Sequence, residues 1–73
     1  MQLQVADGRN LAVDGAYRWS QEGPNFSHAE SAINHLNFDY DRLVTAQSVF
    51  RIVDLWGAVL MEDSAIRARI RKR

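Results

Sequence analysis

The side chains best suited to recognising a charged ligand lie in the last seven positions of this 73-residue chain. Five of them are basic: Arg67, Arg69, Arg71, Lys72 and Arg73. Arginine binds phosphate oxygens through paired hydrogen bonds, and a run of basic residues gives nucleic-acid affinity that falls with salt. Basic residues also favour helix C-termini through the helix dipole, so the alternative explanation is a structural role that involves no ligand. The tail therefore predicts contact with nucleic acid or with an acidic protein surface, such as the body of a partner subunit.

The charge distribution along the rest of the chain bears on both possibilities. The first 66 residues hold four arginines against all nine acidic residues, a formal charge of −5, whereas the last seven residues carry +5. A negative body repels the phosphates of duplex DNA, so nucleic-acid contact is expected from the tail before the polar face of the sheet. An acidic body followed by a basic tail is the main electrostatic feature of the sequence.

The remaining polar residues do not form a pattern typical of catalysis or metal binding. There is no cysteine, and His28 and His35 are seven residues apart, whereas helical metal pairs need a spacing of three or four. Asp39 and Asp41 are explained by helix capping. The serines lack a nucleophile-elbow pattern, and the four glycines are too scattered for a phosphate-binding loop. We therefore expect neither an enzyme nor a protein with a metal or cofactor.

Length and composition indicate one small domain over residues 1–73 with a marginal core. Such a domain usually needs a disulfide, a metal ion or a partner subunit to be stable. The start of the chain has no secretion signal, and cysteine is absent, so we expect the cytoplasm, or the host cytoplasm if the protein is phage-encoded. The most apolar window, 43–61, contains Gln47, Arg51 and Asp54. It is therefore interpreted as a buried helix, and no membrane span is expected.

Residues 2–20 are predicted to form a three-stranded antiparallel meander with turns at Asp7-Gly8 and Asp14-Gly15. The large apolar residues all have odd numbers: Leu3, Val5, Leu11, Val13, Tyr17 and Trp19. Only an odd-numbered loop keeps them on one face, so Val5 should pair with Arg9 and Gly8 should adopt a positive φ. The opposite face should be wet, and it would carry Gln2, Gln4, Asn10, Ala12 and Arg18.

Two helices should follow the meander. The capping box from Ser27 to Glu30 predicts a short helix over 27–37, and Asp39 or Asp41 should cap a long helix over 41–62. The basic segment 64–73 is a C-terminal helix or a tail. The expected fold class is therefore α+β, a three-stranded antiparallel β-meander followed by two helices packed on one face (βββαα).

The predicted long helix is too apolar for its own domain. Its apolar arc covers about two-thirds of the helix circumference, well beyond the ~100° that a surface helix needs. A second cluster, Ile52, Leu55 and Val59, lies away from the face that suits the sheet. That excess indicates a small non-catalytic protein-binding module acting as a homodimer or docked on a larger protein. Compact chains without an active site often are inhibitors, adaptors or accessory subunits, including phage-encoded ones. The alternative is a nucleic-acid-binding protein that uses the arginine-rich C-terminus.

Overall fold

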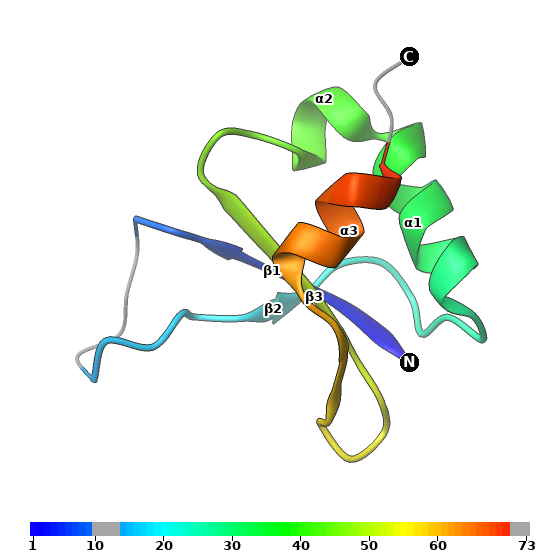
Figure 1. The fold of residues 1–73 in the computed structure, drawn as a ribbon, viewed down its shortest axis with the longest axis horizontal. Coiled ribbons are helices and arrows are strands. Elements are labelled where there is room, and N and C mark those ends of the chain that lie inside the picture. The colour runs from blue at the N-terminus through cyan, green and yellow to red at the C-terminus, as the bar shows by residue number, and fades with distance from the viewer. Residues whose placement is uncertain (10–13, 71–73) are drawn as a thin grey trace.

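The computed structural model describes residues 1–9 and 14–70, which form an antiparallel sheet and three helices (Figure 1). The four strands lie in the spatial order β2-β1-β3-β4. They are β1 (Gln2–Asp7), β2 (Ser20–Gln21), β3 (Ser48–Val53) and β4 (Val59–Met61), and the helices are α1 (Ala29–Phe38), α2 (Tyr40–Leu43) and α3 (Asp63–Arg69). The α+β class is confirmed, but the predicted three-stranded meander with two helices is not the arrangement found. No helix in the described part of the chain is long and apolar enough to cross a membrane.

The predicted meander register is wrong because both edges of β1 pair with other segments. Val5 lies between Ser20 of β2 and Phe50 of β3, so it cannot pair with Arg9. Gly8 does not have a positive φ, and its N–H donates to the carbonyl of Gln47 at 2.7 Å. Leu11 and Val13, together with Asn10 and Ala12 of the expected wet face, lie outside the described residues.

The largest correction concerns the predicted long helix over 41–62. α2 ends at Leu43 after a single turn, and the chain then forms the hairpin of β3 and β4. In β3, Phe50 and Ile52 lie on one face of the sheet, while Val49 and Val53 lie on the other. A strand that is apolar on both faces produces the same wide apolar arc as a buried helix, and its β-branched side chains favour the strand.

The short helix is found close to its predicted position. α1 covers Ala29–Phe38 instead of 27–37, and its N-cap is His28, which makes no side-chain cap hydrogen bond. The predicted capping box at Ser27 is therefore not formed, and Glu30 instead makes an ion pair with Arg69 of α3. Part of the predicted basic segment is helical, as α3.

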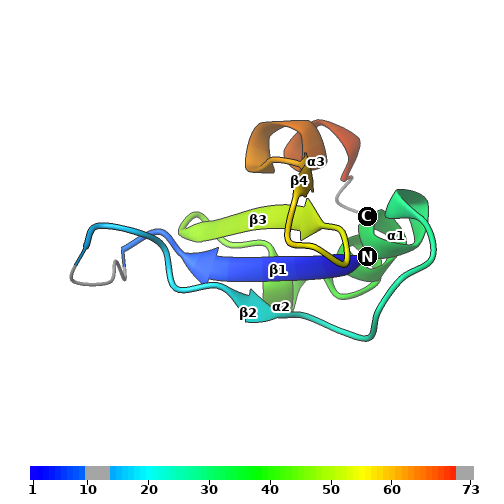
Figure 2. The same cartoon turned by 90° about the horizontal axis from the view of Figure 1, so that it is seen from below.

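The core lies where the three helices meet one face of β1 and β3. Its buried side chains are Leu3, Phe50 and Ile52 from the sheet, Ala32, Ile33 and Leu36 from α1, and Leu43 and Ile66 from α2 and α3. Figure 2 shows α3 above β3, and α1 at the end of the sheet near the N-terminus. Because α3 covers β3 on one side only, the hairpin beyond it extends free of any helix (Figure 1).

Candidate functional site

The turn between β3 and β4 is held by hydrogen bonds from its own backbone and from one carboxylate. The Asp54 N–H donates to the Ala58 carbonyl at 3.0 Å, and the Gly57 N–H donates to the Asp54 carbonyl at 3.1 Å. Asp54 Oδ1 accepts from the N–H groups of Trp56 and Ala58, both at 2.9 Å. Gly57 has φ +82°, which a residue with a side chain rarely adopts. The turn thus depends on Asp54 and Gly57, and not on the side chains of residues 55 and 56.

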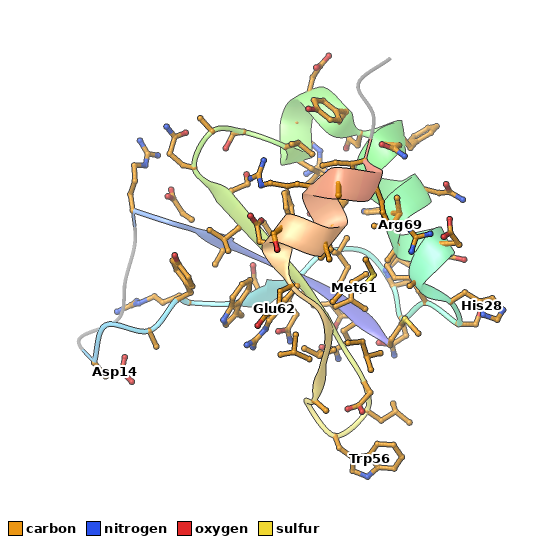
Figure 3. All side chains as sticks on the ribbon, in the orientation of Figure 1. Asp14, His28, Trp56, Met61, Glu62 and Arg69 are labelled. Carbon is orange, nitrogen blue, oxygen red and sulfur yellow. The ribbon has the colours of Figure 1, made fainter. Side chains whose placement is uncertain are left out.

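Positions 55 and 56, whose side chains the turn does not need, carry large apolar residues. Leu55 is 83% exposed and Trp56 is 87% exposed, and Figure 3 shows Trp56 at the hairpin tip pointing away from the rest of the molecule. Val59 and Leu60 of β4 are about half exposed and continue the apolar surface along the strand. We call Leu55, Trp56, Val59 and Leu60 the hairpin surface.

The structure separates the three residues predicted as a partner or dimer interface. Leu55 and Val59 lie on the hairpin surface, whereas Ile52 is fully buried in the core opposite Leu3. Trp56 and Leu60 are not in the cluster of Ile52, Leu55 and Val59 that the helical wheel indicated, so the sequence reasoning missed them. The signal that could have found them is Asp54 followed by Gly57, the chemistry of a bulged three-residue hairpin loop.

Along this edge of the sheet, the stretch of β3 beside α3 and the strand β4 differ in how their outer backbone groups are hydrogen-bonded. Next to α3, the Phe50 N–H donates to Asp63 Oδ1 at 2.9 Å, and the Ser48 carbonyl accepts from Arg67. Arg67 Nε is in turn 3.0 Å from Asp63 Oδ2, so one ion pair of α3 covers this stretch of β3. Within residues 1–9 and 14–70, no side-chain hydrogen bond reaches the backbone of β4, which is the outermost strand on this side of the sheet. On this side, β4 is therefore the edge open to another strand.

The predicted basic contact residues are placed in part. Arg67 binds Asp63 and the Ser48 carbonyl, and its guanidinium lies 5.5 Å from the centre of the Phe50 ring. Arg69 pairs with Glu30 and lies against α1 in Figure 3. Arg71, Lys72 and Arg73 lie outside the described residues. Arg67 and Arg69 thus already have partners within the domain.

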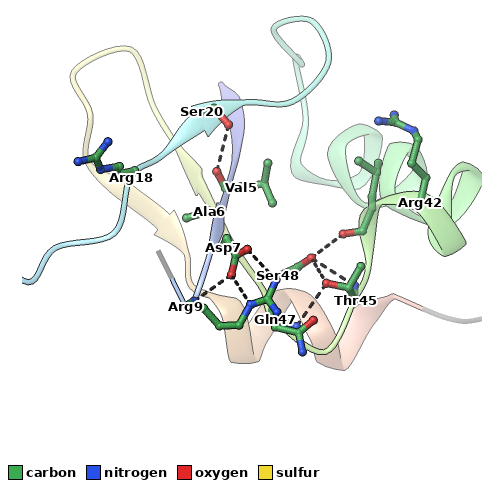
Figure 4. A pocket seen from close by; sticks show the side chains of 11 residues that line it. Val5, Ala6, Asp7, Arg9, Arg18, Ser20, Arg42, Thr45, Gln47 and Ser48 are labelled. Atoms are coloured by element: carbon green, nitrogen blue, oxygen red, sulfur yellow. Dashed lines mark hydrogen bonds and ion pairs between the residues drawn. The ribbon is translucent and has the colours of Figure 1, made fainter. Parts of the chain in front are cut away.

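A pocket of about 380 Å³ at the end of β1 brings together Arg9, Arg18 and Arg42 (Figure 4). Arg9 is paired with Asp7 at 3.2 Å, and the hydrogen bond from its guanidinium lowers the pKa of the Asp7 carboxyl. Arg42 is paired with Asp39 and lies 3.8 Å from Glu22. Figure 4 shows Arg18 and Arg42 on opposite sides of the pocket. The three guanidinium groups therefore do not converge on one ligand position.

The hydroxyl groups of this pocket are also occupied. Ser20 Oγ donates to the Val5 carbonyl at 3.3 Å, and Ser48 Oγ donates to the Leu43 carbonyl at 2.8 Å. Because Ser48 has only one hydroxyl hydrogen, the Thr45 hydroxyl must be the donor in its 2.9 Å contact with Ser48. None of these three hydroxyls keeps a free hydrogen, so the pocket offers an anion little besides exposed arginines.

The two histidines have structural surroundings. His35 Nε2 is 3.0 Å from Glu22 Oε2, and its ring packs against Phe26 with the ring centres 5.6 Å apart. His28 is the exposed N-cap residue of α1. Among the residues that the structure describes, no group of three or more histidine, aspartate or glutamate side chains could hold a metal ion.

Comparison with family models, curated proteins and solved structures gives no match for this chain. The class of the protein is therefore assigned from its own fold. It belongs to the class of small α+β domains with a four-stranded antiparallel sheet, and its hairpin surface lies at the open edge of that sheet.

Proposed function

We propose that this protein is a non-catalytic protein-binding module that docks through the hairpin surface. The observation that carries the proposal is the exposure of Leu55 and Trp56 on a turn that does not need them. Clusters of exposed apolar side chains mark interaction sites on small proteins, and tryptophan is enriched among the residues that dominate binding energy. An inhibitor, adaptor or accessory subunit of the cytoplasm is the kind of protein that fits.

The magnitudes indicate that the tip does not act alone. Full burial of a large apolar side chain contributes about 1.5–3 kcal/mol, so Leu55 and Trp56 together supply about 3–6 kcal/mol. Association costs at least about 4 kcal/mol in lost translational and rotational freedom. A stable complex therefore needs a further contribution, and the open edge of β4 can supply backbone hydrogen bonds by strand addition.

The test is capture of partner protein from source cells by the tagged full chain, with Trp56→Ser as the variant. Its control is Phe38→Ser, because Phe38 is 84% exposed but lies at the end of α1. We expect stoichiometric capture by the wild type and by Phe38→Ser, and loss of capture by Trp56→Ser. Equal capture by both variants would show that the hairpin surface is not the docking site.

The same experiment separates the alternative function, nucleic-acid binding by the C-terminal arginines. Nuclease treatment and removal of residues 71–73 should leave protein capture unchanged if the hairpin surface is responsible. Capture that disappears with nuclease and falls steeply with salt would identify a nucleic-acid-binding protein instead. The intramolecular contacts of Arg67 and Arg69 favour the first outcome.

A further inference from the structure

A second cavity, of about 220 Å³, is lined by the segment that leads into β2, by β3 and by the chain from β4 to the start of α3. Its lining is mainly apolar and includes Tyr17, Trp19, Val49 and Val59. Pockets for drug-sized molecules measure about 300–1,000 Å³. This smaller cavity is therefore suited to a ligand of about one ring system.

Two aromatic side chains give the cavity its shape. The rings of Tyr17 and Trp19 contact each other edge to face, with their centres 5.6 Å apart and their planes at 75°. Tyr17 is 40% exposed, so part of its ring remains open to a ligand. Aromatic side chains bind flat heterocycles by stacking, because the π face of the ligand packs on the π face of the protein ring. The pair therefore favours a flat ligand over a branched one.

Two oppositely charged side chains line the same cavity without contacting each other. The Arg51 guanidinium lies 4.2 Å from the centre of a Trp19 ring, and its Nε donates to Gln4 Oε1 at 2.6 Å. Its two terminal nitrogen atoms have no acceptor within residues 1–9 and 14–70. In the same part of the chain, the Glu62 carboxylate makes no hydrogen bond or ion pair. Donors on Arg51 and acceptors on Glu62 thus remain available to a ligand.

The formal charges of the lining cancel. Arg51 offsets Glu62, and the Asp63 carboxylate is paired with Arg67 at 3.0 Å and also accepts from the Phe50 N–H. Glu62 repels an anion and Arg51 repels a cation, so the cavity favours a group without net charge. Such a group needs acceptors for the arginine and donors for the carboxylate.

We infer that this cavity binds a guanine base. Guanine is flat and uncharged, and its O6 and N7 atoms are the acceptors that arginine commonly binds. Its N1–H and N2–H groups stand side by side as two donors, which match the two oxygens of one carboxylate. Adenine, cytosine and uracil lack that pair of neighbouring donors. The inference goes beyond the proposed docking function and shares only Val59 with the hairpin surface.

A free amino acid is the competing ligand, because its carboxylate and ammonium groups also match Arg51 and Glu62. Both of its charges would have to leave water, which costs more than the transfer of an uncharged base. The base itself has two sources, a free guanine nucleotide or a guanine in a single strand. Both present the same edges to the cavity, so the experiment includes both.

The first measurement uses the two tryptophans of the chain, whose indole N–H signals are separate in a ¹⁵N NMR spectrum. Titration with guanosine monophosphate at millimolar concentration should shift the signal of Trp19, which lines the cavity. The signal of Trp56 should stay in place, because Trp56 is at the hairpin tip. Adenosine monophosphate carries the same sugar and phosphate and should bind about 10-fold more weakly or worse, because its base presents the wrong edge.

The second measurement removes the carboxylate. Glu62→Gln should weaken guanosine monophosphate binding about 10-fold, because the amide has one acceptor oxygen and turns a donor toward a donor of the base. Folding should not change, because the Glu62 side chain caps nothing in α3. Asp41→Asn is the matched control, since it removes the same charge at an exposed position of α2 and should leave binding unchanged.

A thymine tract with one central guanine, compared with an all-thymine tract, identifies the source. Tighter binding of the guanine-containing tract than of guanosine monophosphate would identify a single strand, and the reverse order a free nucleotide. An unmoved Trp19 signal, equal affinity for the two nucleotides, or equal affinity of Glu62→Gln and Asp41→Asn would overturn the inference. A Trp19 shift with free phenylalanine but not with guanosine monophosphate would replace the base by an amino acid. None of these results changes the capture experiment with Trp56→Ser, so the docking function stands or falls separately.

Discussion

At the scale of single residues, Ile52 and Leu55 show how strongly the local structure decides a side chain's role. Three residues apart, they would share one face of a helix. In the hairpin, Ile52 lies in β3 with none of its surface exposed, while Leu55 lies in the turn and is 83% exposed. Two apolar side chains of equal size therefore differ in role, because one belongs to the core and the other to the exposed hairpin surface.

This difference predicts effects of very different size on stability. Ile52→Ala should lower the free energy of unfolding by about 2–5 kcal/mol, because it removes buried methylene groups and leaves a cavity. Leu55→Ala should change it by less than about 0.5 kcal/mol, because the side chain has few contacts to lose. Urea unfolding of the two variants at matched concentration measures both values. Similar losses at the two positions would contradict the hairpin.

At the scale of elements, α3 completes the sheet edge that β4 leaves uncovered. The Asp63 carboxylate accepts from the Phe50 N–H, and Arg67 donates to the Ser48 carbonyl, so the helix supplies the bonds that a longer β4 would have made. Covering or charging an exposed edge is a common protection against unwanted strand pairing. On this side of the sheet, it limits strand addition to β4.

Arg67 is therefore expected to matter for stability, unlike its neighbour in the helix. Arg67→Ala should cost about 1–3 kcal/mol, because the Ser48 carbonyl and the Asp63 carboxylate lose a partner. Arg69→Ala serves as the control and should cost at most about 1 kcal/mol, because it removes only a surface ion pair with Glu30. Thermal and urea unfolding compare the two. A negligible effect of Arg67→Ala, together with reduced nucleic-acid affinity, would return Arg67 to the role predicted from the basic tail.

At the scale of the whole molecule, the strand order places the two longest strands in the middle of the sheet. β1 pairs with both β2 and β3, and β3 pairs with both β1 and β4. The pairing of Leu3 with Ile52 joins residues 49 positions apart, so the centre of the sheet forms only when these two distant segments meet. The hairpin tip, by contrast, has only local bonds.

The rates of amide hydrogen exchange should reflect this contrast between the central strands and the hairpin tip. The amides of Leu3–Ala6 and Phe50–Val53 should exchange most slowly, and those of residues 55–57 most quickly, because exchange reports local opening. Uniform protection across residues 43–61 would indicate the long helix instead.

The sequence by itself determined the features that depend on local chemistry. Alternation of apolar residues located β1, and the predicted short helix over 27–37 starts two residues before α1. The excess of apolar side chains around residues 52–59 pointed to a surface where Leu55 and Val59 are exposed. In each case the signal lies in the type and spacing of neighbouring residues, which the rest of the fold does not change.

Only the tertiary structure decided which strands pair and which apolar residues remain exposed. β3 is apolar on both faces, a pattern that helix and strand share, so its identity depended on whether a neighbouring strand was available. β1 supplies that neighbour from the other end of the chain, and the pairing buries Ile52. Hydrogen bonds between strands join residues distant in sequence, whereas helical bonds join residues four apart. A local pattern therefore could not specify the partner of β1, the covered edge of β3 or the exposed position of Trp56.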